Sequence, residues 1–390
     1  MNRREVKRAP VLRFKGFTND WEQRKPGDFL VESKIIGHKG DKAKKLTVKL
    51  WGKGVQEKQD ILSGSANTQY YIRKSGQLMY GKLDFLHAAF GIVPSQLNNY
   101  ESTIDSPSFD VKSANSIFLL NLFLRKKFYL YYGERANGSR KAKRIHEKDF
   151  LVMPIKMPEI NEQNKISNLI EIVNNRITLQ QRKLSLIKTL KRSFLSDLFF
   201  KTSTNSIVIT LKQVTSIRGG YAFKSKEFTE NGYPIIKIAN ISNNGEIKGP
   251  YSYTNNFNKK YILTKNDIVL AMSGATTGKI AKLRSSKSFL QNQRIGYFCK
   301  TNNIDYNYLY YLLISDQFKK QLKRITIAGA QPNVSSLDIE NFRFSVLSSK
   351  NKQKKISDFL NKLDIKIRIT NKKITIFSQL KRSLLNNMFI

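Results

Sequence analysis

Apolar residues recur at alternating steps of four and three in two long stretches of the chain, residues 163–199 and 353–389. This spacing is typical of a helix that buries one stripe in a coiled coil. Neither stretch contains proline or glycine, so nothing inside it would break a helix. The sequence predicts two long helices that pair with each other; the alternative is that each helix packs on its own domain. The predicted pairing positions are Ile166, Ile170, Val173, Ile177, Leu184, Ile187, Ile356, Leu360, Leu363, Ile367, Ile374 and Phe377.

The two stretches are copies of one another at a constant offset, with Gln163 corresponding to Gln353 and no gap between the copies' matching positions. Polar residues stand at matching points of the stripe, among them Lys191 and Lys381. A period this long is not that of a solenoid repeat. The chain is therefore predicted to be one large unit written twice. The copies share Lys-Ile-Ser at 165–167 and 355–357, and Leu-Lys-Arg-Ser at 190–193 and 380–383.

The regions before and between these stretches alternate short strand-like runs with turns, and each also carries one helix-like segment. The fold class predicted is α+β, with two similar β-rich domains and two long antiparallel coiled-coil helices related by a pseudo-twofold. The predicted domains are 1–157, 158–200, 201–348 and 349–390. Strands are predicted at 46–50, 69–72, 77–80, 90–93, 150–155, 207–209, 234–238, 268–271 and 342–347, and helices at 117–129 and 306–325.

The net charge of +40 is the strongest compositional feature. The two long stretches carry only +12 of it, so most of the basic excess lies in the globular regions. A folded surface this basic favours a polyanion as partner, with nucleic acid the leading candidate. No apolar run is long enough to span a membrane, and the first residues lack the apolar core of a signal peptide. The single cysteine suits a reducing compartment and predicts a cytoplasmic protein.

No catalytic motif stands out. None of the nine prolines is adjacent to another, so the Asn-Pro-Pro-aromatic motif expected of an adenine methyltransferase is missing. Residues 274–279 resemble a phosphate-binding loop, but the glycine spacing is one residue short and Ile280 replaces the Ser or Thr. One cysteine and three histidines argue against a Cys/His zinc site. We therefore predict no catalytic residue and no metal site.

Candidate DNA contacts lie in loops that combine amide, hydroxyl and cationic side chains. Arginine and asparagine can read guanine and adenine edges, whereas lysine mostly holds phosphate. A solvated surface residue is the alternative for each position, and the loops as groups are the firmer prediction. The candidates are Lys44, Lys45, Lys49, Lys53, Arg135, Asn137, Arg140, Lys141, Lys143 and Arg144 in the first region, and Thr276, Thr277, Lys279, Gln331, Asn333 and Ser335 in the second.

Over essentially its whole length the chain resembles the specificity subunits of type I restriction–modification systems. The resemblance rests on the order and duplication of its parts, on residues 14–24 (FKGFTNDWEQR), on residues 329–335 (GAQPNVS), and on the Gln-x-Lys-Ile starts at Gln163 and Gln353. One departure is Pro26, where a leucine usually precedes the Gly-Asp of Gly27 and Asp28. Since proline has no amide donor, this departure puts the local strand pairing in doubt.

The resemblance implies a non-catalytic DNA-specificity subunit in a host-defence complex. Each globular region would read one half of a split site on double-stranded DNA, and the helices would set the spacing. Two modification subunits would dock on the helices and bring S-adenosylmethionine to methylate adenine, and two motor–nuclease subunits would complete the restriction enzyme. This chain would carry no cofactor of its own. Alternatives are a stand-alone nuclease or methyltransferase and a coiled-coil scaffold that binds protein.

Overall fold

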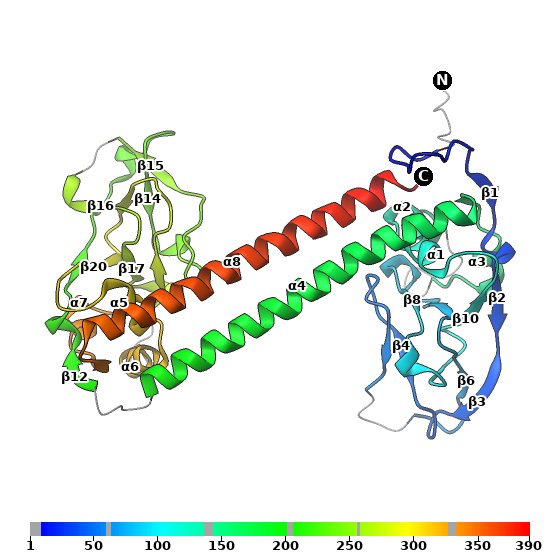
Figure 1. Ribbon diagram of the computed structural model, residues 1–390, viewed down its shortest axis with the longest axis horizontal. Helices are drawn as coiled ribbons and strands as arrows, with labels where there is room; N and C mark the ends of the chain where they lie inside the picture. Colours follow the sequence, from blue (N-terminus) through cyan, green and yellow to red (C-terminus); the bar gives the residue numbers. More distant parts are fainter. Residues whose placement is uncertain (1–8, 60–63, 136–142, 201–205, 256–257, 327–332) are drawn as a thin grey trace. The chain divides into compact units, whose positions relative to one another are not determined.

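The computed structural model describes residues 9–59, 64–135, 143–200, 206–255, 258–326 and 333–390 (Figure 1). The chain divides into two compact units. The first unit comprises residues 1–181 and 372–390, and the second comprises residues 182–371. Each unit therefore contains one globular part and half of each long helix.

Two long helices confirm the prediction from the apolar spacing: α4 (Ile160–Phe200) with 41 residues and α8 (Lys350–Asn387) with 38. At roughly 1.5 Å per residue, each is about 60 Å long. Ser349 caps the start of α8, because its Oγ accepts from the Lys352 amide at 3.4 Å. α4 begins just after Pro158, where a missing amide costs no intrahelical hydrogen bond.

The first unit is built from antiparallel strands and three short helices. Its largest sheet has the order β2-β10-β7-β8, and a two-stranded pair, β1-β11, closes the region before α4. The strands are β1 (Glu22–Arg24), β2 (Leu30–Ser33), β3 (Ile35–Lys39), β4 (Leu46–Val48), β5 (Val55–Glu57), β6 (Gln69–Ile72), β7 (Leu78–Tyr80), β8 (Phe90–Ile92), β9 (Glu101–Ser102), β10 (Ser108–Val111) and β11 (Ile155–Met157). The helices are α1 (Ser116–Phe123), α2 (Lys126–Glu134) and α3 (Glu147–Leu151).

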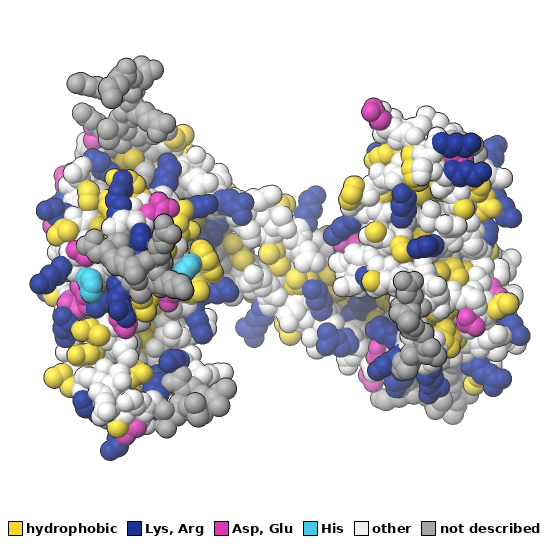
Figure 2. Space-filling view, turned by 180° about the vertical axis from the view of Figure 1, so that it is seen from behind, with side chains coloured by type: hydrophobic (Ala, Val, Ile, Leu, Met, Phe, Trp, Pro, Cys, Tyr) yellow, Lys and Arg dark blue, Asp and Glu magenta, His cyan; other side chains and the backbone are white. Residues whose placement is uncertain are grey.

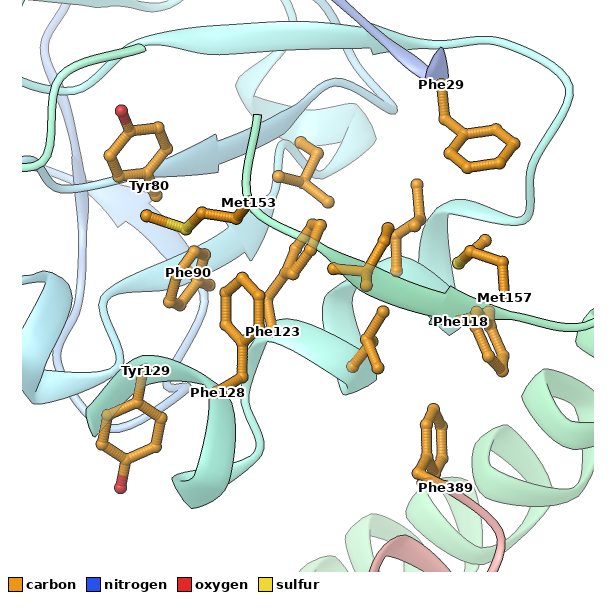
Figure 3. Packing of buried hydrophobic residues seen from close by; sticks show 14 of the residues in the cluster. Phe29, Tyr80, Phe90, Phe118, Phe123, Phe128, Tyr129, Met153, Met157 and Phe389 are labelled. Atoms are coloured by element: carbon orange, nitrogen blue, oxygen red, sulfur yellow. The ribbon is translucent and has the colours of Figure 1, made fainter. Parts of the chain in front are cut away.

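An aromatic cluster forms the core of the first unit (Figure 3). Tyr80 stacks on Phe109 with ring centroids 6.0 Å apart and lies 4.7 Å from Phe150. The end of the chain belongs to this core, because Phe389 packs on Phe118 at 5.0 Å and on Trp21 at 6.2 Å. The apolar residues of both chain ends therefore stabilise the same unit.

The second unit repeats this plan. A two-stranded pair, β12-β21, matches β1-β11, and the sheet β13-β20-β17-β18 matches β2-β10-β7-β8. A further sheet, β15-β14-β19-β16, contains a parallel pair between β14 and β19. The strands are β12 (Ser206–Thr210), β13 (Ile217–Gly219), β14 (Tyr233–Ile236), β15 (Ser252–Thr254), β16 (Ile262–Leu263), β17 (Ile268–Ala271), β18 (Ile280–Lys282), β19 (Phe289–Gln291), β20 (Ile295–Phe298) and β21 (Arg343–Leu347). The helices are α5 (Tyr306–Leu313), α6 (Asp316–Thr326) and α7 (Ser336–Glu340).

The structure corrects three local predictions. The segment 117–129 is two helices, α1 and α2, and 306–325 is likewise split into α5 and α6. The predicted strand at 150–155 is wrong, because Phe150 lies in α3 and only Ile155 onward pairs with β1. The doubt about strand pairing at Pro26 is unfounded, because Pro26 opens a short 3₁₀ helix and the strands on either side of it, β1 and β2, pair with β11 and β10.

Candidate nucleic-acid interface

In the first unit, the cap of α1 is fixed to the start of α4. Asn115 caps α1 by accepting from the Phe118 amide at 2.9 Å. The Asn115 amide donates to Gln163 Oε1 at 3.0 Å, and the Ser167 hydroxyl donates to Asn115 Oδ1 at 2.8 Å. Gln163 also donates to the Pro158 carbonyl at 2.8 Å. Two residues of the duplicated helix start therefore hold the globular part on α4.

In the second unit, the contacts of the helix cap recur at the corresponding positions, and the glutamine again donates to a carbonyl just before its helix. Asp305 caps α5 by accepting from the Tyr308 amide at 2.7 Å. The Asp305 amide donates to Gln353 Oε1 at 2.9 Å, and the Ser357 hydroxyl donates to Asp305 Oδ1 at 2.8 Å. Gln353 donates to the Leu347 carbonyl at 2.7 Å. This repeated Gln-and-Ser contact, hereafter the docking contact, explains why the two helices share their first residues.

The predicted pairing positions pack on the globular parts near the helix starts and on the other helix elsewhere. In the second unit the two helices touch directly, with the Phe194 and Phe359 rings 4.9 Å apart. Both alternatives considered from the sequence thus occur: the helices pair with each other, and each also packs on a globular part. The core of the first unit contains Ile166, Ile170 and Val173, with Ile177 and Phe377 at its edge. The core of the second unit contains Leu360 and Leu363, with Ile187 and Ile356 at its edge. The remaining pairing positions are half-buried: Leu184, Ile367 and Ile374.

Asp364 of α8 is a polar centre in the second unit that the sequence did not single out. Its Oδ1 accepts from Lys191 Nζ of α4 at 2.6 Å. Its Oδ2 lies 2.9 Å from the Tyr311 hydroxyl and 3.7 Å from Arg284. Burial raises the pKa of Tyr311, so this hydroxyl stays protonated and can donate. The carboxylate thus joins the two long helices to α5 and to the segment that follows β18.

Lys282 of β18 is buried beside this centre. Its ammonium bonds Asn307 and lies 5.6 Å from the centroid of the Tyr310 ring. Burial lowers the pKa of Lys282 to about 8. The side chain therefore stays mostly charged at pH 7 but loses its proton at a lower pH than a free lysine does.

The lowered pKa of Lys282 predicts a pH-dependent stability of the second unit. Its folded pKa lies below its ordinary value, so the unfolded chain binds more protons between the two values. We expect the free energy of unfolding to rise with pH across that interval. In Lys282→Met this part of the rise should disappear, and urea unfolding followed across the interval measures it. Equal slopes for the two proteins would contradict the assignment.

A cavity of about 630 Å³ lies in the second unit between its globular part and the helices. It contains two predicted DNA contacts, Thr277 and Lys279. Basic residues outnumber acidic ones around it, so it attracts anions. The basic residues are Lys188, Lys191, Arg192, Lys279, Arg284, Lys319 and Arg368, and the acidic ones are Glu246, Asp316 and Asp364.

The structure brings together the two predicted reading segments of the second unit. Ser273 forms an isolated β-bridge with Asn333, and the Val334 amide donates to the Met272 carbonyl at 3.0 Å. Thr276 belongs to the 3₁₀ turn η8 (Gly274–Thr276), and Thr277 and Lys279 follow it. Ser335 caps α7 by accepting from the Asp338 amide at 3.0 Å, so its hydroxyl already has a structural role. Gln331 lies outside the described residues.

In the first unit, Lys44, Lys49 and Lys53 are exposed, as phosphate contacts require. Lys45 differs, because it is buried with its ammonium 5.9 Å from the centroid of the Tyr70 ring. Its burial follows from the bridge that its backbone forms with Glu101. The strip of four lysines predicted from the sequence therefore has three exposed members.

The ends of the predicted basic loop of the first unit also meet. Lys143 Nζ donates to the Glu134 carbonyl at 2.6 Å. Arg135 is exposed with its guanidinium 3.3 Å from the centroid of the Tyr131 ring, and Arg144 lies 3.5 Å from Asp105. Lys and Arg side chains are spread over the visible face of each unit (Figure 2). Asn137, Arg140 and Lys141 lie outside the described residues.

Two absences are observed within the described ranges. No helix there is both long and apolar enough to cross a membrane. In the same part of the chain, His, Cys, Asp and Glu side chains form no group of three or more that could hold a metal ion.

Comparison with known proteins finds similarity in sequence over part of the chain. Residues 205–376 match the family described as the type I restriction modification DNA specificity domain. The type I restriction enzyme MjaVIII specificity subunit of Methanocaldococcus jannaschii is 28% identical over 268 residues, which cover 62% of this chain and 62% of that protein. The match thus spans less than two thirds of that relative's length.

Solved structures agree with this in fold. The S subunit of a type I restriction-modification system from M. genitalium superposes with a TM-score of 0.67 at 15% identity, covering 98% of this chain and 99% of that one. A chain from work on complex assembly and conformational transition of the type I R-M system gives 0.51 at 13% identity, covering 95% and 97%. The fold class is therefore that of two mixed α+β units joined by long helices. Residues 205–376 thus resemble a type I restriction modification DNA specificity domain in sequence, and the whole chain shares the fold of the S subunit from M. genitalium.

Proposed function

We propose that this chain reads a split DNA site, each unit contacting one half. The observation that carries the proposal is the docking contact, which fixes equivalent globular parts to equivalent helix positions through Gln163 and Gln353. A repeated scaffold held in this way suits two readers with a defined separation. The basic charge of both globular regions supports DNA as the partner.

The loops that would read DNA differ between the units, although the scaffold is shared. The first unit offers exposed lysines in the β4–β5 hairpin and cations beside α2. The second unit offers Lys279 after η8 with Asn333 alongside, whereas the Thr276 hydroxyl oxygen is buried and the Thr277 hydroxyl donates to the Gly274 carbonyl at 2.7 Å. Side chains of different hydrogen-bonding type read different bases, so the two halves of the site would differ in sequence.

As a specificity subunit the chain is not itself an enzyme. Two modification subunits would dock along α4 and α8, bring S-adenosylmethionine and methylate an adenine in each half-site. Two motor–nuclease subunits would complete the restriction complex. The helix length between the docking contacts would set the spacing between half-sites, because every residue advances a helix by the same rise along its axis.

A domain exchange tests the proposal. Replacing residues 22–157 by those of a relative should change one half of the methylated motif and leave the other half and the spacing as they were. Replacing residues 206–348 is the matched control and should change the opposite half. Methylated motifs are mapped by sequencing DNA from cells that carry each chimaera with the partner subunits. Methylation that proceeds equally well without this chain would refute the proposal.

A further inference from the structure

The hairpin between β4 and β5 presents an exposed tryptophan. Trp51 is 58% exposed, whereas the chain's other tryptophan, Trp21, is 2% exposed. Trp51 also has φ +61°, a left-handed conformation that is unfavourable for a bulky side chain. Exposure of the indole and the left-handed backbone conformation are both unfavourable, and they coincide at this residue. Backbone strain of this kind concentrates at functional sites.

The conformation of this tip is fixed by contacts with the 3₁₀ turn η2 (Phe85–His87). The Trp51 amide donates to the His87 carbonyl at 2.7 Å, and the Gly52 amide donates to the Ala88 carbonyl at 2.9 Å. The indole meets the His87 ring edge-on, with centroids 5.4 Å apart. Because Phe85 of η2 lies in the aromatic core, the tip is attached to the packed core of the unit.

Lysines precede and follow Trp51 in the sequence. Lys49 and Lys53 are exposed, and Leu50 beside them is 37% exposed. The tip therefore offers an aromatic and an aliphatic side chain with an exposed lysine before and after them in the sequence. Protein interfaces deplete lysine around their apolar centre. DNA suits a surface that combines apolar side chains with lysines, because phosphates flank every base.

We propose that Trp51 contacts DNA bases, its indole stacking on a base or entering a base step while Lys49 and Lys53 hold the adjacent phosphates. Aromatic side chains stack on bases of any sequence, and apolar side chains inserted at a step partly unstack it. This inference rests on the proposed function and adds a base-contacting residue to the first unit's reader.

The test uses the full chain and a DNA duplex. The sequence of this duplex is the one that the chain selects by binding from a library of random DNA duplexes. Heparin serves as a polyanion without bases. Trp51→Gly is the principal variant, because glycine accepts φ +61° without strain. We expect it to raise the thermal midpoint and to weaken duplex binding by roughly 5- to 150-fold, the range for loss of one stacked base. Heparin binding should stay unchanged. Trp51→Tyr should keep most duplex affinity.

Fluorescence supplies a second measurement. Duplex should quench the wild-type tryptophan emission and shield it from acrylamide, and heparin should do neither. Trp51→Tyr retains only buried Trp21 and should show no quenching. Lys49→Ala and Lys53→Ala should weaken binding to both duplex and heparin, because they remove charge.

Three outcomes would overturn the inference. Wild-type affinity of Trp51→Gly for the duplex, together with unquenched emission, would remove Trp51 from the interface while leaving the proposed function intact. Loss of modification-subunit binding by Trp51→Gly with unchanged DNA affinity would make the tip a protein contact. Failure of the chain, alone and with modification subunits, to retain any duplex sequence would overturn the proposed function as well.

Discussion

Arg73→Met is expected to destabilise the first unit by about 4 kcal/mol or more, because it removes a buried hydrogen-bonding hub. The Arg73 side chain is 2% exposed. It donates to Ser102 Oγ at 2.7 Å, to Ser108 Oγ at 2.9 Å and to the Ser33 carbonyl at 2.9 Å. Burial lowers its pKa to about 10, so it remains charged at neutral pH.

Methionine would leave these acceptors buried without a donor, each at about 1–3 kcal/mol. Arg73→Lys should recover little, because one ammonium cannot replace a planar fork of donors. Urea unfolding followed by circular dichroism measures the loss. Arg24→Met is the matched control: Arg24 is partly exposed and pairs with Asp28 at the surface, so we expect a much smaller change than for Arg73→Met. Equal effects of the two variants would contradict the role assigned to Arg73.

The long helices could be predicted because their signal is local. An uninterrupted apolar spacing with no breaker determines α4 and α8 without reference to the rest of the fold. The strand at 150–155 could not be separated from a helix in the same way. Phe150 is apolar in either case, and only the aromatic cluster around Tyr80 decides that it lies in a helix.

The candidate site, too, could be predicted only in part from the sequence. Composition identifies basic loops, and the structure keeps Lys44, Lys49 and Lys53 exposed. Burial of Lys45 depends on a bridge to Glu101, which is distant in the sequence, so no local pattern shows it. Arg73 and Asp364 were missed for the same reason, since the acceptors and donors around them come from distant segments.

Asp364→Ala is expected to destabilise the second unit by about 3–5 kcal/mol, the usual cost of removing one partner from a buried ion pair. Its carboxylate is the acceptor for Lys191 at 2.6 Å, and the lysine side chain is only 17% exposed. Alanine would leave this ammonium enclosed without a counter-charge beside Tyr311. Asp364→Asn should cost less than Asp364→Ala, since an amide oxygen still accepts a hydrogen bond.

The first unit supplies the matched reciprocal experiment. In the duplicated copy, the positions that correspond to Asp364 and Lys191 are occupied by Asn174 and Lys381. Burial lowers the pKa of Lys381, and within the described residues it forms no ion pair. Asn174→Asp should therefore stabilise the first unit, because it supplies the carboxylate that the second unit has. Urea unfolding of the three variants tests the pair. Destabilisation by Asn174→Asp, or wild-type stability of Asp364→Ala, would show that the carboxylate does not hold the helices as the second unit's geometry indicates.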